Sequence, residues 1–165
     1  MSAAKSRAQR DRGKWSMPGV PHKGWWCIGL KDLKGLFGIC EMCETQSIRY
    51  VHYMEHPDYP DVLGAGSVCA GHMEGDYAAP QQREKQAISL AARRSRWMNT
   101  KWRQSAKGNP YLNRSGFNIV LYPSGRHWAF RIERRNSGQS WRRAGYATID
   151  DAKLAAFERF TKLQQ

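Results

Sequence analysis

The sequence lacks the features that would place it in several large protein classes. No stretch approaches the eighteen or so apolar residues of a membrane span, so we expect no contact with the membrane interior. No Gly-x-x-x-x-Gly-Lys phosphate loop and no Gly-x-Ser-x-Gly nucleophile elbow occurs. No hydrophobic signal segment precedes the cysteines, which favours a metal over disulfides and predicts a cytoplasmic protein.

Acidic residues are scarce, at 14 Asp and Glu against 27 Lys and Arg, and the net charge is +13. Such a charge indicates a polyanionic partner, and nucleic acid is favoured over an anionic membrane surface. The charge is unevenly placed: residues 1–25 carry +5, residues 26–77 carry −5 and residues 78–165 carry +13. We therefore expect the two flanking segments to meet phosphates, because the acidic middle would repel them.

Cysteine is also sparse, but its spacing is informative. Cys40 and Cys43 are separated by two residues, and Cys69 follows beyond a hairpin-like stretch. This pattern predicts a structural Zn²⁺ site, since a Cys-x-x-Cys turn supplies two tetrahedral ligands from one turn. The fourth ligand is either His72, three positions after Cys69 on the same predicted helix face, or Cys27 from across a loop.

Residues 24–77 are predicted to form a Cys-x-x-Cys turn, called the knuckle, then a hairpin, and then a metal ligand at the start of a helix. This order resembles a treble-clef zinc finger, which implies a metal-stapled scaffold more than an activity. About fifty residues with few large aliphatic side chains need such a metal to fold. Residues 48–52 and 69–73 also resemble small zinc proteins of phages and mobile elements, which implies a bacterial or phage-infected cell.

The segments on either side of this module are basic. Residues 1–23 mix Lys, Arg, Ser, Gln and Gly without apolar periodicity and are predicted to form a disordered basic arm. Residues 78–108 are predicted to form a basic amphipathic helix, whose Arg93 and Arg94 are candidates for contact with a phosphate backbone. Its apolar stripe comprises Ile88, Ala91, Ala92, Ser95, Met98 and Trp102.

Residues 109–165 predict a three-stranded antiparallel sheet packed on a C-terminal helix, which makes the fold class α+β. Three strand-like runs, 117–122, 127–135 and 141–148, are separated by turn sequences. Thr148 and Asp151 form a capping-box pattern that begins the closing helix. The apolar stripe of this helix comprises Ala152, Ala155, Ala156, Phe160 and Leu163.

The sheet face opposite the helix is expected to be basic, because charged and apolar side chains alternate along the middle strand. Arginines on a narrow sheet suit the major groove, and we expect DNA as a partner more than RNA. Besides Arg93 and Arg94, the candidate nucleic-acid-binding residues are Arg126, Arg131, Glu133, Arg135, Arg142 and Arg143.

The Pro-Ser-Gly turn at 123–125, the run Gly-Arg-His-Trp-Ala-Phe-Arg-Ile at 125–132 and the segment 145–157 carry a family resemblance. Residues 116–163 resemble the DNA-binding domain of plant ethylene-response factors and the arm-binding domains of phage-type integrases. The resemblance implies a sheet in the major groove, with Arg131, Glu133 and Arg142 on the contact side. The first strand departs from the plant domains because it lacks their arginines.

Two alternatives to the DNA-binding hypothesis remain open. The acidic residues 24–77 could make the protein an adaptor for a protein partner. The treble clef is also related to HNH-type nucleases, in which His52 and His56 would act as general base and metal ligand. The segment between Cys43 and Asp76 has no Asn to orient the water, so we expect a non-enzymatic protein.

Overall fold

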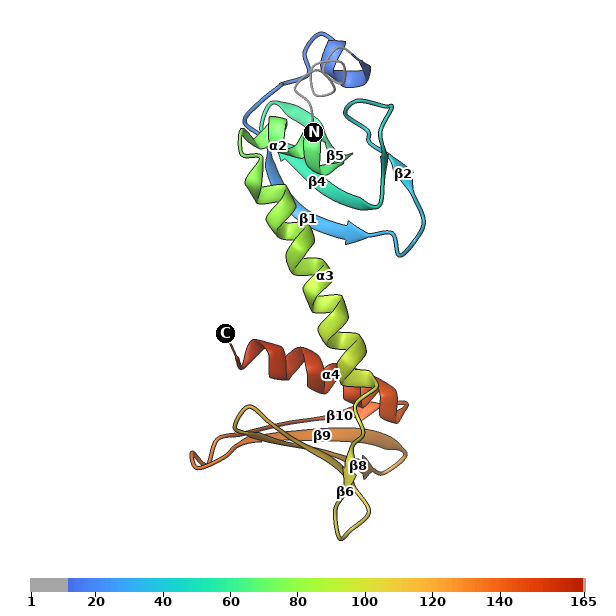
Figure 1. Ribbon diagram of the computed structural model, residues 1–165, viewed down its shortest axis with the longest axis vertical. Coiled ribbons are helices and arrows are strands. Elements are labelled where there is room, and N and C mark those ends of the chain that lie inside the picture. Colours follow the sequence, from blue (N-terminus) through green and yellow to red (C-terminus); the bar gives the residue numbers. More distant parts are fainter. Residues whose placement is uncertain (1–11, 165) are drawn as a thin grey trace. The chain divides into compact units, whose positions relative to one another are not determined.

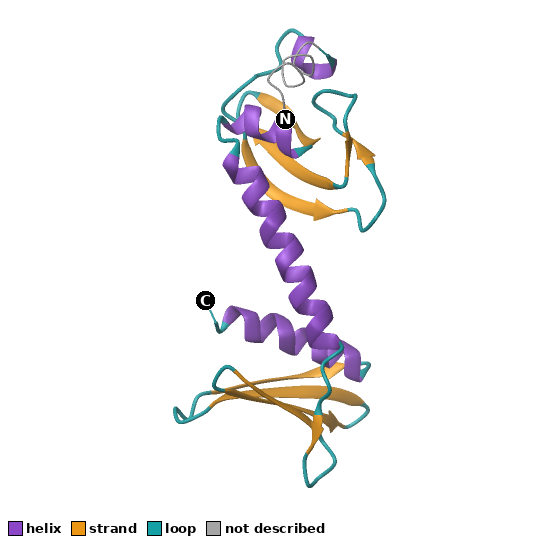
Figure 2. Ribbon diagram, viewed as in Figure 1, coloured by secondary structure: helices purple, strands orange, loops and turns teal. Residues whose placement is uncertain are grey.

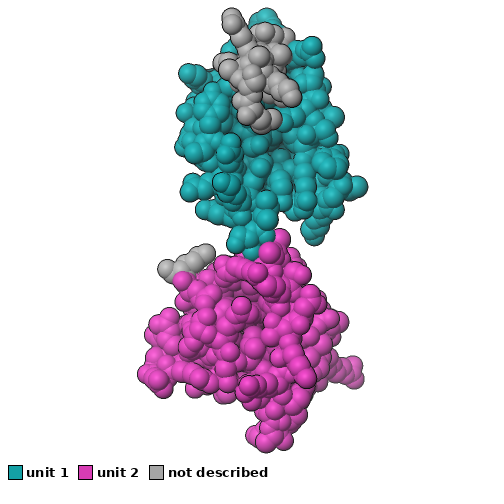
Figure 3. Space-filling view, viewed as in Figure 1, with its two compact units in different colours: residues 1–89 teal, residues 90–165 magenta. Residues whose placement is uncertain are grey.

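The computed structural model describes residues 12–164 and confirms an α+β protein (Figures 1 and 2). The chain divides into two compact units, residues 1–89 and residues 90–165 (Figure 3). Each unit has its own antiparallel sheet and its own hydrophobic core. The boundary falls within one helix, so that each unit takes part of it.

Unit 1 is built on a three-stranded antiparallel sheet of order β1-β4-β5 and a short hairpin of β2 and β3. A short helix, α2, follows β5 directly and packs against the three-stranded sheet (Figure 1). The elements are β1 (Trp26–Asp32), β2 (Gly38–Ile39), β3 (Ser47–Ile48), β4 (Tyr50–His56), β5 (Tyr59–Ala65) and α2 (Ser67–Glu74). The Cys-x-x-Cys loop between β2 and β3, the β4–β5 hairpin and α2 therefore follow one another along the chain.

The core of unit 1 holds sulfur where other domains hold aliphatic side chains. Met42, Met54 and Met73 are completely buried. Three of the four cysteines are buried among them. Large aliphatic side chains are few in this cluster, as the sequence suggested.

The N-terminal segment corrects one expectation. Residues 12–23 pack on unit 1 rather than forming part of a disordered arm; residues 1–11 lie outside the described residues. A 3-10 turn, η1 (Gly13–Ser16), places Trp15 in the core with only 3% of its surface exposed, and Val20 is buried as well. The segment is ordered because the Trp15 side chain packs against residues distant in sequence. The basic composition of the segment does not indicate this packing.

Helix α3 (Ala78–Met98) is shorter than the predicted span 78–108, because the residues after it form strands. Its predicted apolar stripe is mostly not buried: Ile88 is 52% exposed, and Ala91 is also exposed. Trp97 and Met98 at its end pack into the core of unit 2. Among residues 12–164, no helix has both the length and the apolar character needed to cross a membrane.

Unit 2 contains five strands rather than the predicted three, in the order β10-β9-β8-β7-β6. The two unpredicted strands come from residues assigned to the preceding helix and to a loop. The strands are β6 (Arg103–Gln104), β7 (Pro110–Arg114), β8 (Phe117–Ser124), β9 (His127–Arg134) and β10 (Ser140–Tyr146). Helix α4 (Ile149–Lys162) lies across one face of this sheet, against β8, β9 and β10 (Figure 1).

Local signals define α4 well. Thr148 is its N-cap, and the reciprocal bonds with Asp151 form the predicted capping box. The helix buries Ala152, Ala156, Phe157 and Phe160 against the sheet; Phe157 was not in the predicted stripe. Ile119, Leu121, Phe130 and Ile132 meet them from the sheet side, together with Trp97.

Candidate metal centre and basic sheet face

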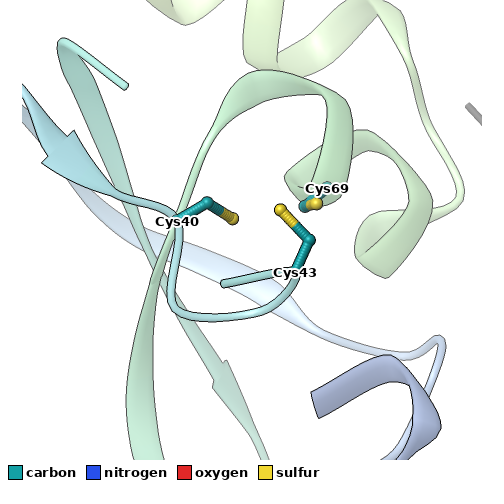
Figure 4. A group of neighbouring side chains, drawn as sticks. All are labelled: Cys40, Cys43 and Cys69. Carbon is teal, nitrogen blue, oxygen red and sulfur yellow. The ribbon is translucent and has the colours of Figure 1, made fainter. Parts of the chain in front are cut away.

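Three thiols meet in unit 1. Cys40 and Cys43 lie in the loop between β2 and β3, and Cys69 lies in the first turn of α2. Their sulfur atoms all lie within 4.8 Å of one another, and none of the three residues has exposed surface. Figure 4 shows the sulfurs pointing toward a common space between the loop and the helix.

The knuckle is held by backbone hydrogen bonds. The N–H of Cys40 donates to the carbonyl of Gln46 at 2.9 Å, and the N–H of Glu44 donates to the carbonyl of Cys40 at 2.8 Å. The N–H of Glu41 donates to the carbonyl of Gly64 on β5 at 2.8 Å. The loop that carries Cys40 and Cys43 is thereby fixed against the strand that leads to Cys69.

The electrostatics around Cys40 favour a thiolate. The pKa of Cys40 is lowered to about 5, mainly by the hydrogen bond with the Cys69 thiol and also by backbone N–H groups. One of these, the N–H of Gly66, lies 3.4 Å from the sulfur. The same pairing, together with burial, raises the pKa of Cys69.

This geometry fits a tetrahedral metal. Zinc–sulfur bonds of about 2.3 Å at tetrahedral angles place sulfurs about 3.8 Å apart, compatible with the observed cluster. A cation between the sulfurs also removes the conflict in which one thiolate keeps its neighbour protonated, since metal ligands are deprotonated outright. The predicted triad is thus brought together, and its chemistry suits a thiolate-binding metal ion.

The two candidates for the fourth ligand differ in their surroundings. Cys27 is half-buried and its thiol donates to the carbonyl of Gly29 at 3.2 Å, outside the cluster. His72 is 7% exposed and stands one turn after Cys69 on α2. Its Nδ1 lies 2.6 Å from the hydroxyl of Tyr77. No nitrogen of His72 is among the described atoms of the 4.8 Å cluster.

The histidines considered for nuclease chemistry make internal contacts. His52 is completely buried, and its Nε2 lies 3.1 Å from a carboxylate oxygen of Glu84 on α3. His56 accepts a hydrogen bond from the backbone N–H of Asp58 at 3.0 Å and its Nε2 faces the carbonyl of Lys23 at 3.1 Å. Both rings therefore join elements of unit 1 to one another.

The strand register in unit 2 decides which arginines share a face. Arg131 on β9 pairs directly with Arg142 on β10 and with Val120 on β8. The same row continues through Tyr111 on β7 to Arg103 on β6. Directly paired residues project to the same side, so this row crosses the sheet on the face opposite α4. Arg103 and Tyr111 were not among the predicted residues, since their strands were missed.

Glu133 lies on this open face beside Arg131. The two side chains form an ion pair of 3.7 Å, and each is a little over two-fifths exposed. Asn118 and Ser140 pair with Glu133 on the neighbouring strands and form a second, uncharged row. Glu133 is therefore placed to orient Arg131 rather than to meet a phosphate.

Of the two candidates Arg142 and Arg143, Arg143 does not lie on the open face. It pairs with Phe130, which α4 covers, so the period-two alternation sends it to the helix side. There it lines a groove of about 470 Å³ with Arg159 and Lys162 of α4, and the lining of this groove also includes Arg142.

The other predicted basic residues lie elsewhere. Arg126 occupies the turn between β8 and β9, and Arg135 follows the end of β9. Arg94 is exposed on α3, and Arg93 donates to Gln164 at 3.5 Å. The structure thus brings Arg131 and Arg142 together with Glu133 and leaves the remaining candidates outside this row.

Comparison of the chain with models of protein families, with curated proteins and with solved structures finds no match. We therefore infer the function from the chemistry and geometry of the residues described above.

Proposed function

We propose that the protein is a non-enzymatic DNA-binding protein with a structural zinc ion. Unit 1 is a treble-clef-type scaffold, and unit 2 binds DNA through the open face of its sheet. The observation that carries the proposal is the row in which Arg131 and Arg142 stand side by side on neighbouring strands. The resemblance to ethylene-response-factor and integrase arm-binding domains supports the same face.

The zinc ion is held by Cys40, Cys43 and Cys69, with His72 as the fourth ligand. When the imidazole binds metal through Nε2, its Nδ1 carries a proton, which it donates to the hydroxyl of Tyr77. Metal-bound histidines characteristically make such a second hydrogen bond, which fixes the ring orientation. The bond between Cys27 and Gly29 favours His72 over Cys27.

The charge of unit 2 supports a polyanionic partner. Residues 90–165 contain sixteen Lys and Arg against four Asp and Glu, whereas residues 1–89 contain eleven against ten. Neutralising phosphates releases condensed counterions, so the affinity should fall steeply with salt. Arginine on a sheet in the major groove also donates two hydrogen bonds to guanine.

Arg142 and Arg143 provide a matched test, because they are adjacent arginines on opposite faces of one strand. Arg142→Ala should weaken duplex binding by about 1–3 kcal/mol if it reads a base, or lower the salt slope by about 0.9 if it holds a phosphate. Arg143→Ala removes the same charge and should change affinity much less. Binding is measured by fluorescence anisotropy at several salt concentrations.

The result that contradicts the proposed surface is equal loss of affinity in both variants, which would reflect net charge alone. Zinc content is measured in the same samples by atomic emission. Both variants should keep one zinc ion per chain, since the substitutions lie in the other unit.

A further inference from the structure

A groove lined by basic and aromatic side chains lies between strand β10 and helix α4 of unit 2. Its volume of about 470 Å³ falls in the range of about 300–1,000 Å³ that small-molecule sites occupy. β10 contributes Trp141, Arg143 and Tyr146 to the lining, and α4 contributes Arg159 and Lys162. β10 is an edge strand, and among residues 12–164 no further strand pairs with its outer side.

The charge of this groove is strongly positive. With Arg142, four basic residues line it, against the single carboxylate of Glu158. Among residues 12–164, no carboxylate forms an ion pair with Arg143, Arg159 or Lys162. Cations that line one groove repel one another, and an anion bound between them removes this repulsion. The groove is therefore complementary in charge to an anionic ligand.

Aromatic rings stand among these cations. Trp141 and Tyr146 are both half-buried, so part of each ring is accessible. The ring of Tyr146 stacks on Phe130, with centroids 5.9 Å apart and planes 25° apart. The guanidinium carbon of Arg159 lies 5.6 Å from the centroid of the Trp141 ring, a cation–π distance. Single-stranded nucleic acid is bound by this combination, in which cations follow the phosphates and aromatic rings stack on the bases.

Helix stability explains only some of the cations. Arg159 and Lys162 lie in the last turn of α4, where positive charge also stabilises the helix C-terminus. Arg143 has no such role, because it lies on a strand. It pairs with Phe130 on the side of the sheet that α4 covers, where β8 and β9 carry apolar side chains. A charge at this position needs another reason.

Protection of the sheet edge is one such reason, since an inward-pointing charge prevents pairing with another strand. This edge is already distorted, however. The register of β10 shifts between Ala144 and Tyr146, and Gly145 between them has a φ of +99°. The same distortion opposes the addition of an extended acidic peptide as a further strand. The groove thus suits a nucleic acid strand better than a peptide.

We propose that the groove between β10 and α4 binds single-stranded nucleic acid. Arg143, Arg159 and Lys162 contact phosphates, and Trp141 and Tyr146 stack on bases. This site goes beyond the proposed function, because it takes an unpaired strand and does not depend on duplex binding by the open face of the sheet.

The charge of the site is tested with the double variant Arg143→Ala/Lys162→Ala in the full-length protein. The probe is a short, fluorescently labelled oligothymidylate, which cannot pair with itself, and binding is measured by fluorescence anisotropy at several salt concentrations. The slope of log affinity against log salt should fall by about 0.7 for each lost phosphate contact. The control is Arg126→Ala/Arg135→Ala, which removes the same charge from two exposed residues outside the groove and should change the affinity much less.

Stacking is tested separately with Tyr146→Leu, which leaves the charge unchanged. We expect the affinity for oligothymidylate to fall at least about fivefold while the salt slope stays the same. Tyr146→Phe keeps the ring and should retain the affinity. Thermal melting shows whether each variant is folded, and the charge variants decide the matter if Tyr146→Leu does not fold.

Equal loss of affinity in the two double variants would overturn the proposal, because net charge alone would explain it. Binding of a polyglutamate peptide in place of oligothymidylate, lost in Arg143→Ala/Lys162→Ala, would overturn it in favour of an acidic protein partner. A protein that binds duplex but not oligothymidylate would also overturn the groove site and leave the proposed function standing. Groove-dependent binding of oligothymidylate without duplex binding would support the site and contradict the proposed function.

Discussion

The two units have cores of different chemistry. In unit 1 the buried cluster contains three cysteines and three methionines, and Ile48 and Leu63 are among its few branched aliphatic residues. In unit 2 the buried cluster consists of Trp97, four phenylalanines, branched aliphatic residues and alanines, and it lies between α4 and the sheet. With the proposed metal ion bound, unit 1 would depend on metal ligation for stability, whereas unit 2 depends on apolar burial.

Metal removal should have the largest effect on the difference in stability between the two units. Structural zinc contributes free energy on the order of 10 kcal/mol to small domains, which is comparable to the whole net stability of a typical domain. An excess of chelator should therefore unfold unit 1 and leave unit 2 folded. Amide NMR spectra with and without chelator report on both units at once.

Cys43→Ser gives the same test without a chelator, and Cys27→Ser is its control, since Cys27 lies outside the thiol cluster. Dispersed unit 1 signals in Cys43→Ser would contradict the metal-dependent core.

The parts of the fold that sequence predicted are those with local causes. Thr148 and Asp151 are three residues apart and make their capping bonds within one turn, so pattern alone found the start of α4. Cys40 and Cys43 are likewise brought together by a single turn. The thiol cluster was predictable because only Cys69 had to come from a distant element.

The parts that sequence missed depend on distant partners. Strand β6 has two residues and β7 begins at Pro110, so neither shows the alternation that marks a strand; each is defined by its neighbour in the sheet. The sequence did not show which of Arg142 and Arg143 lies on the open face, because the face of a strand residue depends on register. Trp15 lies in a basic segment, and nothing nearby in sequence indicates that it is buried in the core of unit 1.

A core substitution in unit 2 should give an intermediate effect. Ile132 is completely buried beneath α4, and Ile132→Ala should lower the free energy of unfolding of unit 2 by about 2–5 kcal/mol. Zinc content and the unit 1 signals should be unchanged. Urea denaturation followed by NMR separates the units, and loss of zinc in this variant would show that the two cores are not independent.

A smaller effect should distinguish the two units, namely how their stability depends on pH. His52 in unit 1 is buried between the sheet and α3, and burial lowers its pKa below the ordinary value of 6.5 despite the opposing influence of Glu84. Arg83 on α3 faces the same ring and also lowers the pKa. The histidine of unit 2, His127, is exposed.

Because the folded-state pKa of His52 is the lower one, the unfolded chain takes up its proton first as pH falls. The stability of zinc-loaded unit 1 should therefore be full above pH 6.5 and decline from there toward the folded-state pKa. In His52→Gln this part of the decline should be absent, while protonation of the metal ligands acts equally on both proteins. Urea denaturation from about pH 7.5 to 5.5 measures the difference, and parallel stability curves for the two proteins would contradict the prediction, because they would show that the pKa of His52 is the same in the folded and unfolded states.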